Sequence, residues 1–180
     1  MRLMLAPMEG VIDHTMRQLL TSMGGIDRCV TEFVRVSAQL LPPRVFRRYC
    51  PELDQGGTTA CGVPVYLQLL GGQVTPMAEN AARAAELGAP GIDLNFGCPV
   101  NKVVAKNGGS SLLRDCPLLV ATARAVVAAC APLGVPVTGK IRTGWDSASV
   151  NAPDVCRLLE DCGVEALAVH GPRQHVDAIL

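Results

Sequence analysis

Residues 91–109 read GIDLNFGCPVNKVVAKNGG and combine a strand-like run with a glycine-rich loop. The first five residues form a short, mostly apolar run that predicts a buried strand. Asn95 ends this run, and Cys98 and Lys102 follow in a long glycine-rich loop. Polar and reactive side chains directly after a buried strand are typical of the carboxyl ends of parallel strands in α/β proteins.

Similar apolar runs on both sides of this stretch predict further strands over residues 3–6, 29–34, 63–70, 135–142 and 166–170. Between them, helical periodicity with capping residues, prolines and glycines at the ends predicts helices over residues 13–23, 75–88, 115–131 and 151–162. Strands that alternate with helices predict parallel βαβ units.

Two architectures fit this alternation, an open doubly wound sheet and an incomplete (β/α)₈ barrel. Polar residues stand at or just beyond the ends of most predicted strands, among them Glu32, Gln68, Lys140 and His170. Strand ends converge on one mouth in a barrel, whereas in an open sheet they spread along an edge. The pattern therefore favours the N-terminal part, about six βα units, of a (β/α)₈ barrel.

Composition limits the class of protein. Roughly half of the 180 residues are apolar and 3% are aromatic, which suits an α/β protein with aliphatic strands. Sixteen basic residues balance sixteen acidic ones, so net charge does not point to a nucleic-acid partner. The eight cysteines form no Cys-x-x-Cys pair, so no metal site is predicted. With no signal peptide and no apolar run of membrane-spanning length, we expect a cytoplasmic protein without a membrane partner.

The stretch from Asn95 to Pro99, with the double glycine and Ser-x-Leu-Leu that follow it, resembles the signature of the tRNA-dihydrouridine synthases. Residues 6–11 (APMEGV), 68–71 (QLLG), 140–145 (KIRTGW) and 170–171 (HG) are similar to further motifs of this family, in the same order. Residues 31–53 look most like the bacterial subfamily C, whose target is uridine 16 of tRNA.

The resemblance implies a TIM barrel that binds FMN and reduces the C5–C6 double bond of uridine in tRNA, with NADPH reducing the flavin. Hydride from the flavin goes to C6 of uracil, and C5 needs a proton from the opposite face. A thiol is mostly protonated at neutral pH and can act as that acid. Cys98 matches the family's catalytic cysteine, and the other seven cysteines have no comparable motif.

The same resemblance suggests residues around the cofactor. Lys140 matches the lysine that places positive charge beside the flavin pyrimidine ring, and Gln68 matches an amide contact to the ring edge. Pro7 and Met8 match first-loop residues that cover the flavin, and His170 matches a position near cofactor and substrate.

Three residues are expected to contact the substrate. Asn95 matches a side chain that orients flavin or uracil near the cysteine, and Arg142 matches a position close to it. Lys102 flanks the cysteine loop, where a lysine can meet a phosphate of tRNA.

The resemblance covers residues 1–171, while the tail 172–180, which begins with an inserted Pro172, diverges from it. A complete family member has eight strands and a C-terminal helical domain, and loops after strands seven and eight hold the flavin phosphate. We therefore expect a truncated chain that encodes the family's chemistry but lacks phosphate-binding and tRNA-binding parts. The alternatives are a non-catalytic fragment and a flavin-dependent dehydrogenase of free pyrimidines.

Overall fold

The computed structural model describes residues 3–105, 107–146 and 148–171, so the divergent tail 172–180 lies outside the described residues. The strands are β1 (Met4–Leu5), β2 (Arg28–Val30), β3 (Val34–Arg35), β4 (Val65–Leu70), β5 (Ile92–Phe96), β6 (Val137–Arg142) and β7 (Ala166–His170). The helices are α1 (His14–Ser22), α2 (Pro43–Tyr49), α3 (Val74–Glu86), α4 (Asn101–Val104), α5 (Cys116–Cys130) and α6 (Ala152–Glu160). Short 3-10 helices lie at η1 (Pro51–Gln55), η2 (Gly109–Arg114) and η3 (Ala131–Leu133).

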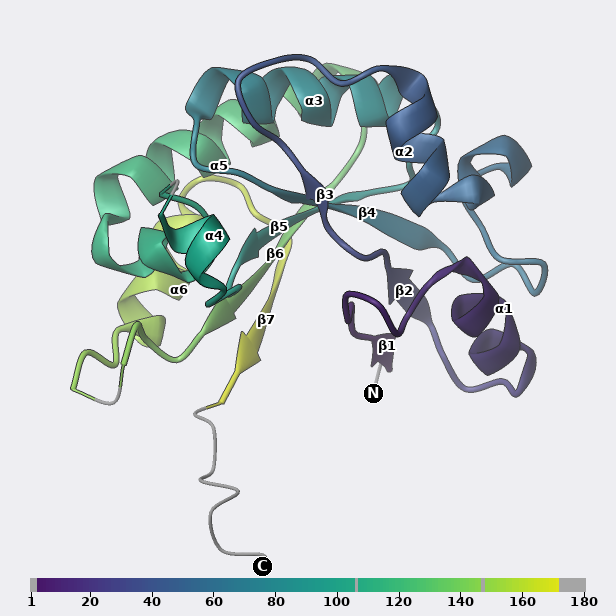
Figure 1. The fold of residues 1–180 in the computed structure, drawn as a ribbon, viewed down its shortest axis with the longest axis horizontal. Coiled ribbons are helices and arrows are strands. Elements are labelled where there is room, and N and C mark those ends of the chain that lie inside the picture. Colours follow the sequence, from purple (N-terminus) through teal and green to yellow (C-terminus); the bar gives the residue numbers. More distant parts are fainter. Residues whose placement is uncertain (1–2, 106, 147, 172–180) are drawn as a thin grey trace, which may run out of the picture.

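The strands form one parallel sheet in the order β1-β2-β4-β5-β6-β7, with β3 beside β4. The predicted strand over residues 29–34 is thus divided into β2 and β3. Each unit adds its strand next to the previous one, which is the order of a barrel, whereas a doubly wound sheet reverses direction. Figure 1 shows the sheet as an arc with α3, α5 and α6 along its outer side. The prediction of an incomplete (β/α)₈ barrel is confirmed.

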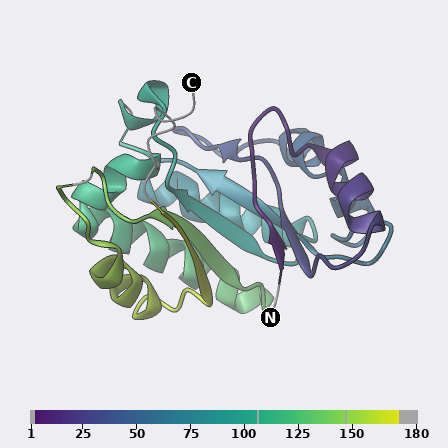
Figure 2. The same ribbon diagram turned by 90° about the horizontal axis from the view of Figure 1, so that it is seen from below.

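Burial falls from the middle of the arc toward its edges. All six residues of β4 are buried, whereas none of the residues of β7 is. Within the described part of the chain, β1 and β7 each pair with a neighbour on one side only. Figure 1 and Figure 2 show these two strands apart from each other, β1 in purple and β7 in yellow, at the two edges of the sheet. Their backbone groups on the outer side are open to another strand.

Helix α1 begins as the sequence predicts but buries a different face. Asp13 is its N-cap, and the Asp13 carboxylate accepts a hydrogen bond from the backbone of the first turn. In the sequence, the i, i+3, i+4, i+7 spacing of Met16, Leu19, Leu20 and Met23 predicts the buried face of this helix, but Leu19 and Met23 are 56% and 77% exposed. The buried residues are instead Arg17 and Thr21. This part of the prediction is wrong because Arg17 has a buried carboxylate partner, Glu52, on the neighbouring segment.

Helix α5 corrects the expectation that no apolar run reaches membrane-spanning length. Residues Cys116–Leu133 are 18 residues long with a mean hydropathy of 1.7, enough to cross a membrane by length and composition alone. The helix packs against α3 and carries its buried residues on one face: Leu119, Thr122, Ala123, Val126 and Cys130. A single buried face is typical of a core helix in a globular domain.

Candidate functional site at the strand ends

The carboxyl ends of β4, β5, β6 and β7 place most of the predicted site residues side by side. Asn95 on β5 is the register partner of Lys140 on β6, and Arg142 on β6 is the partner of His170 on β7. Side chains two residues apart on a strand share a face. Asn95 and Lys140 therefore lie on the same face of the sheet as Asp93 and Thr138, the polar residues two positions earlier on β5 and β6. The register of neighbouring strands therefore determines which polar side chains lie together at this site.

Two residues before Asn95 on β5, a buried hydrogen-bond network centres on Asp93. The Asp93 carboxylate accepts hydrogen bonds from Gln68 Nε2 at 2.7 Å and from Thr138 Oγ1 at 2.6 Å. Asn95 Nδ2 in turn donates to Gln68 Oε1 at 2.8 Å. Burial raises the pKa of Asp93, although the hydrogen bonds from Thr138 and Gln68 oppose that shift. The network fixes the amide orientation of Gln68, with one amide hydrogen left for another partner.

The loop that carries Cys98 is fastened at both ends. Asn95 Oδ1 accepts hydrogen bonds from the backbone N–H groups of Gly97 and Cys98, at 3.1 and 2.9 Å. The Cys98 carbonyl accepts the N–H of Ser110 at 2.9 Å. Gly109 has φ +60°, and a Cβ there would lie 2.5 Å from the Cys98 carbonyl oxygen, so only glycine fits. This contact gives the second glycine of the motif, Gly109, a physical reason.

Positive charge gathers above the Asp93 network. Lys140 Nζ lies 3.4 Å from His170 Nδ1, and Arg142 Nε donates to the Gly97 carbonyl at 2.7 Å. Burial, and then the charge of Arg142, lower the pKa of Lys140. The charge of Lys140 is the main reason that the pKa of His170 is lowered. No carboxylate among the described residues forms a salt bridge with Lys140 or Arg142, so this corner of the site is suited to an anion.

These groups surround one cavity of about 230 Å³, which we call the strand-end cavity. It is lined by seven of the residues singled out from the sequence: Pro7, Gln68, Asn95, Cys98, Lys140, Arg142 and His170. Glu9 and Phe33 complete one wall. Residues from six separate segments of the chain therefore meet at this cavity, at the strand ends where a barrel places them.

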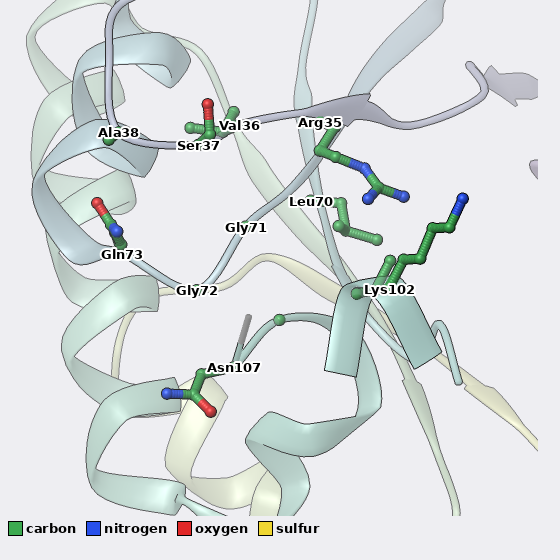
Figure 3. A pocket seen from close by; sticks show the side chains of 12 residues that line it. Arg35, Val36, Ser37, Ala38, Leu70, Gly71, Gly72, Gln73, Lys102 and Asn107 are labelled. Atoms are coloured by element: carbon green, nitrogen blue, oxygen red, sulfur yellow. The ribbon is translucent and has the colours of Figure 1, made fainter. Parts of the chain in front are cut away.

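Two predicted residues do not line the strand-end cavity. Met8 is 57% exposed in the first loop. Lys102 lies on α4 and lines a different cavity of about 450 Å³, together with Arg35. Figure 3 shows the side chains of Arg35 and Lys102 extending to the same side of that cavity.

Sequence reasoning missed Asp93, which organises the site although it does not line the cavity. Its signal was present in the alternation of Asp93 and Asn95 within an otherwise apolar strand, since residues two apart face the same way. Glu32 was noted only as a polar strand-end residue. It accepts the N–H of Gly10 at 2.5 Å and so fastens the first loop, which contains Pro7 and Met8.

Three of the other cysteines are fully buried, unlike Cys98. Burial raises the pKa of Cys29 to about 11, of Cys130 to about 11 and of Cys50 to about 12. Such thiols act as small apolar fillers. Cys98 is half-buried and lines the strand-end cavity, which sets it apart from these buried cysteines.

Comparison with protein families gives a match to the family described as dihydrouridine synthase over residues 4–177. Among curated proteins, the tRNA-dihydrouridine(16) synthase of Vibrio cholerae is 52% identical over 171 residues, which are 93% of this chain and 50% of that protein. The protein of the same name from Escherichia coli is 47% identical over 171 residues, 95% of this chain and 54% of that protein. The chain thus spans about half the length of these relatives.

Solved structures with similar folds are distant in sequence. A 2,3-dimethylmalate lyase of the PEP mutase/isocitrate lyase superfamily has a TM-score of 0.60 at 15% identity, over 94% of this chain and 58% of that one. A variant of NCR from Zymomonas mobilis has a TM-score of 0.57 at 14% identity, over 99% of this chain and 68% of that one. At such identities the likeness concerns the fold alone.

Proposed function

The chain belongs to the dihydrouridine synthase family, and we propose that it carries the reaction centre for FMN-dependent reduction of the C5–C6 double bond of a tRNA uridine, uridine 16, with NADPH as reductant. The observation that carries this proposal is that Cys98 and Lys140 reach one cavity from adjacent strands. A proton donor and a cation that line the same small cavity suit a reaction that adds a proton and a hydride equivalent to one double bond.

The residues present fit the ring edge of a flavin. Lys140 is a half-buried cation without a salt-bridge partner in the described chain. Burial and then the charge of Arg142 lower the pKa of this residue, against an opposing effect of Asp93, and so disfavour its positive charge. An anionic reduced flavin would compensate it. The free amide hydrogen of Gln68, held in place through Asp93 and Asn95, is suited to a ring oxygen or nitrogen. Pro7 contributes an apolar wall.

The chemistry that bound FMN supplies, with NADPH as its reductant, is a hydride equivalent for C6 of uracil. Cys98 donates its thiol proton to C5, and the thiolate is reprotonated from solvent, to which the half-buried side chain has access. Asn95 holds the Cys98 loop through two backbone hydrogen bonds, which keeps the thiol over the cavity. Arg142, fixed by its hydrogen bond to Gly97, presents positive charge to a uracil carbonyl.

Lys102 is proposed to contact a tRNA phosphate rather than the uracil. It lines the cavity shown in Figure 3 with Arg35, and no carboxylate in the described ranges forms a salt bridge with either side chain. Two exposed cations at one place can neutralise a phosphate. Replacing Lys102 with Ala should weaken tRNA binding and make it less dependent on salt, without a change in FMN affinity.

The first test is the visible absorption spectrum of the purified chain after incubation with excess FMN and removal of unbound flavin. A retained flavin spectrum supports the proposal, and a colourless protein supports the non-catalytic alternative. The second test offers NADPH with unmodified tRNA, uracil or orotate and measures dihydrouridine or dihydropyrimidine. If product forms with tRNA and with neither uracil nor orotate, the result supports tRNA as the substrate. Product only from the free pyrimidines would replace it with a pyrimidine dehydrogenase activity.

A further inference from the structure

A third cavity lies beside the Cys98 loop, and the proposed reaction places no reacting group in it. It measures about 740 Å³ and lies between the end of the Cys98 loop and the segment after β6. Pro99 and Arg142 line both this cavity and the strand-end cavity, so these two side chains separate them. We call this space the Trp145 cavity, after the one tryptophan of the chain.

The Trp145 cavity contains an unsatisfied hydroxyl group. Ser110 lines it and is 1% exposed, and Ser110 Oγ has no hydrogen-bond partner in the described structure. The backbone N–H of the same residue donates to the Cys98 carbonyl. A buried hydroxyl without a partner destabilises a protein, so such a group is explained by a ligand that satisfies it.

The remaining walls suit a flat ring. Trp145 is half-buried, and the Arg114 guanidinium lies 3.9 Å from its ring centroid, which restrains the indole. Val104 and Val150 add apolar surface. The wall with Val150 exists because Gly144 permits close approach of the chain: a Cβ at Gly144 would lie 2.2 Å from a backbone oxygen.

From this geometry we propose that the Trp145 cavity binds the nucleobase next to the reacting uridine in the RNA strand. An aromatic wall, aliphatic walls and a buried hydrogen-bonding group together recognise a base by stacking and by its polar edge. A phosphate is disfavoured because the carboxylate of Asp146 also lines the cavity. Because the two cavities share Arg142, adjacent nucleotides of one strand can occupy them together. The inference rests on the proposed function, in that it takes the reacting base to lie in the strand-end cavity.

Trp145 makes the test specific, because it is the only tryptophan and its emission reports on this cavity. The chain is titrated with the dinucleotide UpU, with UMP and with unmodified tRNA, while polarisation of labelled RNA measures binding independently. The dinucleotide and tRNA should quench Trp145 emission, and UMP should do so more weakly. Equal quenching by UMP would overturn the assignment to a neighbouring base. Unchanged emission with every ligand would overturn the site.

Two variants keep the inference separate from the proposed function. Ser110→Ala should weaken RNA binding about threefold to tenfold, the loss of one hydrogen bond, while its thermal stability is unchanged or higher. Trp145→Ala should weaken binding about fivefold or more, and Trp145→Phe should restore most of it. Ser22→Ala, on an exposed face of α1, is the control. If Ser110→Ala and Trp145→Ala both bind RNA and retain FMN as well as the parent chain, the inference is refuted. The proposed function would still stand in that case.

Discussion

Asn95 holds Cys98 in place: its side-chain Oδ1 accepts the backbone N–H of Cys98 at 2.9 Å. The amide nitrogen of the same side chain donates to Gln68, so the orientation of Asn95 is itself fixed by the strand network below. The cysteine loop and the network around Asp93 are therefore one unit, in which a change at the strand reaches the thiol through two hydrogen bonds.

Replacing Cys98 with Ala should nearly abolish dihydrouridine formation while FMN remains bound. Loss of a general acid typically lowers the rate ~10²–10⁴-fold. The assay uses this chain with FMN and NADPH and, in parallel, a chimera that adds the C-terminal half of the Vibrio cholerae relative. Cys116→Ala is the matched control, since Cys116 is also half-buried but lies on α5. An undiminished rate in the Cys98 variant would refute the assigned role.

Replacing Asn95 with Ala should lower the catalytic rate by up to ~10²-fold through misplacement of the thiol, with a smaller effect on flavin affinity. The reason is that Gly97 and Cys98 lose the acceptor of their backbone N–H groups. Steady-state kinetics in the same chimera separate the effect on kcat from that on KM. A change confined to KM would mean that Asn95 contacts substrate rather than positioning the loop.

The sequence predicted the strands well because each is a short apolar run with polar residues at its carboxyl end. Periodicity alone left the choice between a barrel and a doubly wound sheet open, since strand order depends on contacts between distant segments. The residues grouped in the strand-end cavity were identified through motif resemblance, and the register of β5 and β6 explains why they meet.

The features that could not be predicted from the sequence depend on residues that pair only in the folded structure. A buried carboxylate such as Asp93 is unfavourable by itself and becomes acceptable only through Gln68 and Thr138, which come from neighbouring strands. The buried face of α1 was wrongly predicted for the same reason: Arg17 is buried because Glu52 meets it. The short helix α4 and the 3-10 helix η2 fall within a stretch whose glycines indicated only a loop.

The charge of Lys140 should change the pKa of His170, which can be measured. Replacing Lys140 with Met should raise the pKa of His170, because the charge of Lys140 is the main cause of its lowering. Lys140→Arg keeps the positive charge and should leave the pKa of His170 low. An NMR titration of the imidazole resonances measures both. If the two variants gave the same pKa for His170, the two side chains would not interact as described. FMN affinity should fall in the Met variant and be largely kept in the Arg variant.

The outer edge of β7, which pairs with no strand among the described residues, should make the chain self-associate. Val169 is 47% exposed on this edge strand, and exposed apolar edge strands pair with other chains. Val169→Lys should reduce association, measured by sedimentation velocity across a concentration series. Leu133→Lys is the matched control, because Leu133 is 45% exposed but lies at η3, outside the sheet. Equal association in both variants would mean that the edge of β7 does not mediate it.

The buried pair of Arg17 and Glu52 should control acid stability. Both side chains are fully buried, with Arg17 Nε 2.8 Å from Glu52 Oε1 and a second hydrogen bond of 2.9 Å to Oε2. Burial alone would raise the pKa of Glu52, but the hydrogen bonds and charge of Arg17 outweigh it, so the pKa is lowered. A carboxylate whose pKa is lower in the folded state stabilises the fold above its unfolded pKa of about 4.3. That stabilisation is lost as the pH falls through the folded pKa.

Glu52→Gln should therefore lower the free energy of unfolding at pH 7 by about 3–5 kcal/mol, because the Arg17 charge stays buried without its partner. The difference between parent and variant should narrow as the pH falls below about 4. Denaturant unfolding from pH 7 to pH 3 measures both effects. Asp54→Asn breaks the exposed Arg47–Asp54 pair of 2.7 Å and should change stability by less than about 1 kcal/mol. A Glu52→Gln loss no larger than this control would show that the buried pair does not hold α1 against η1.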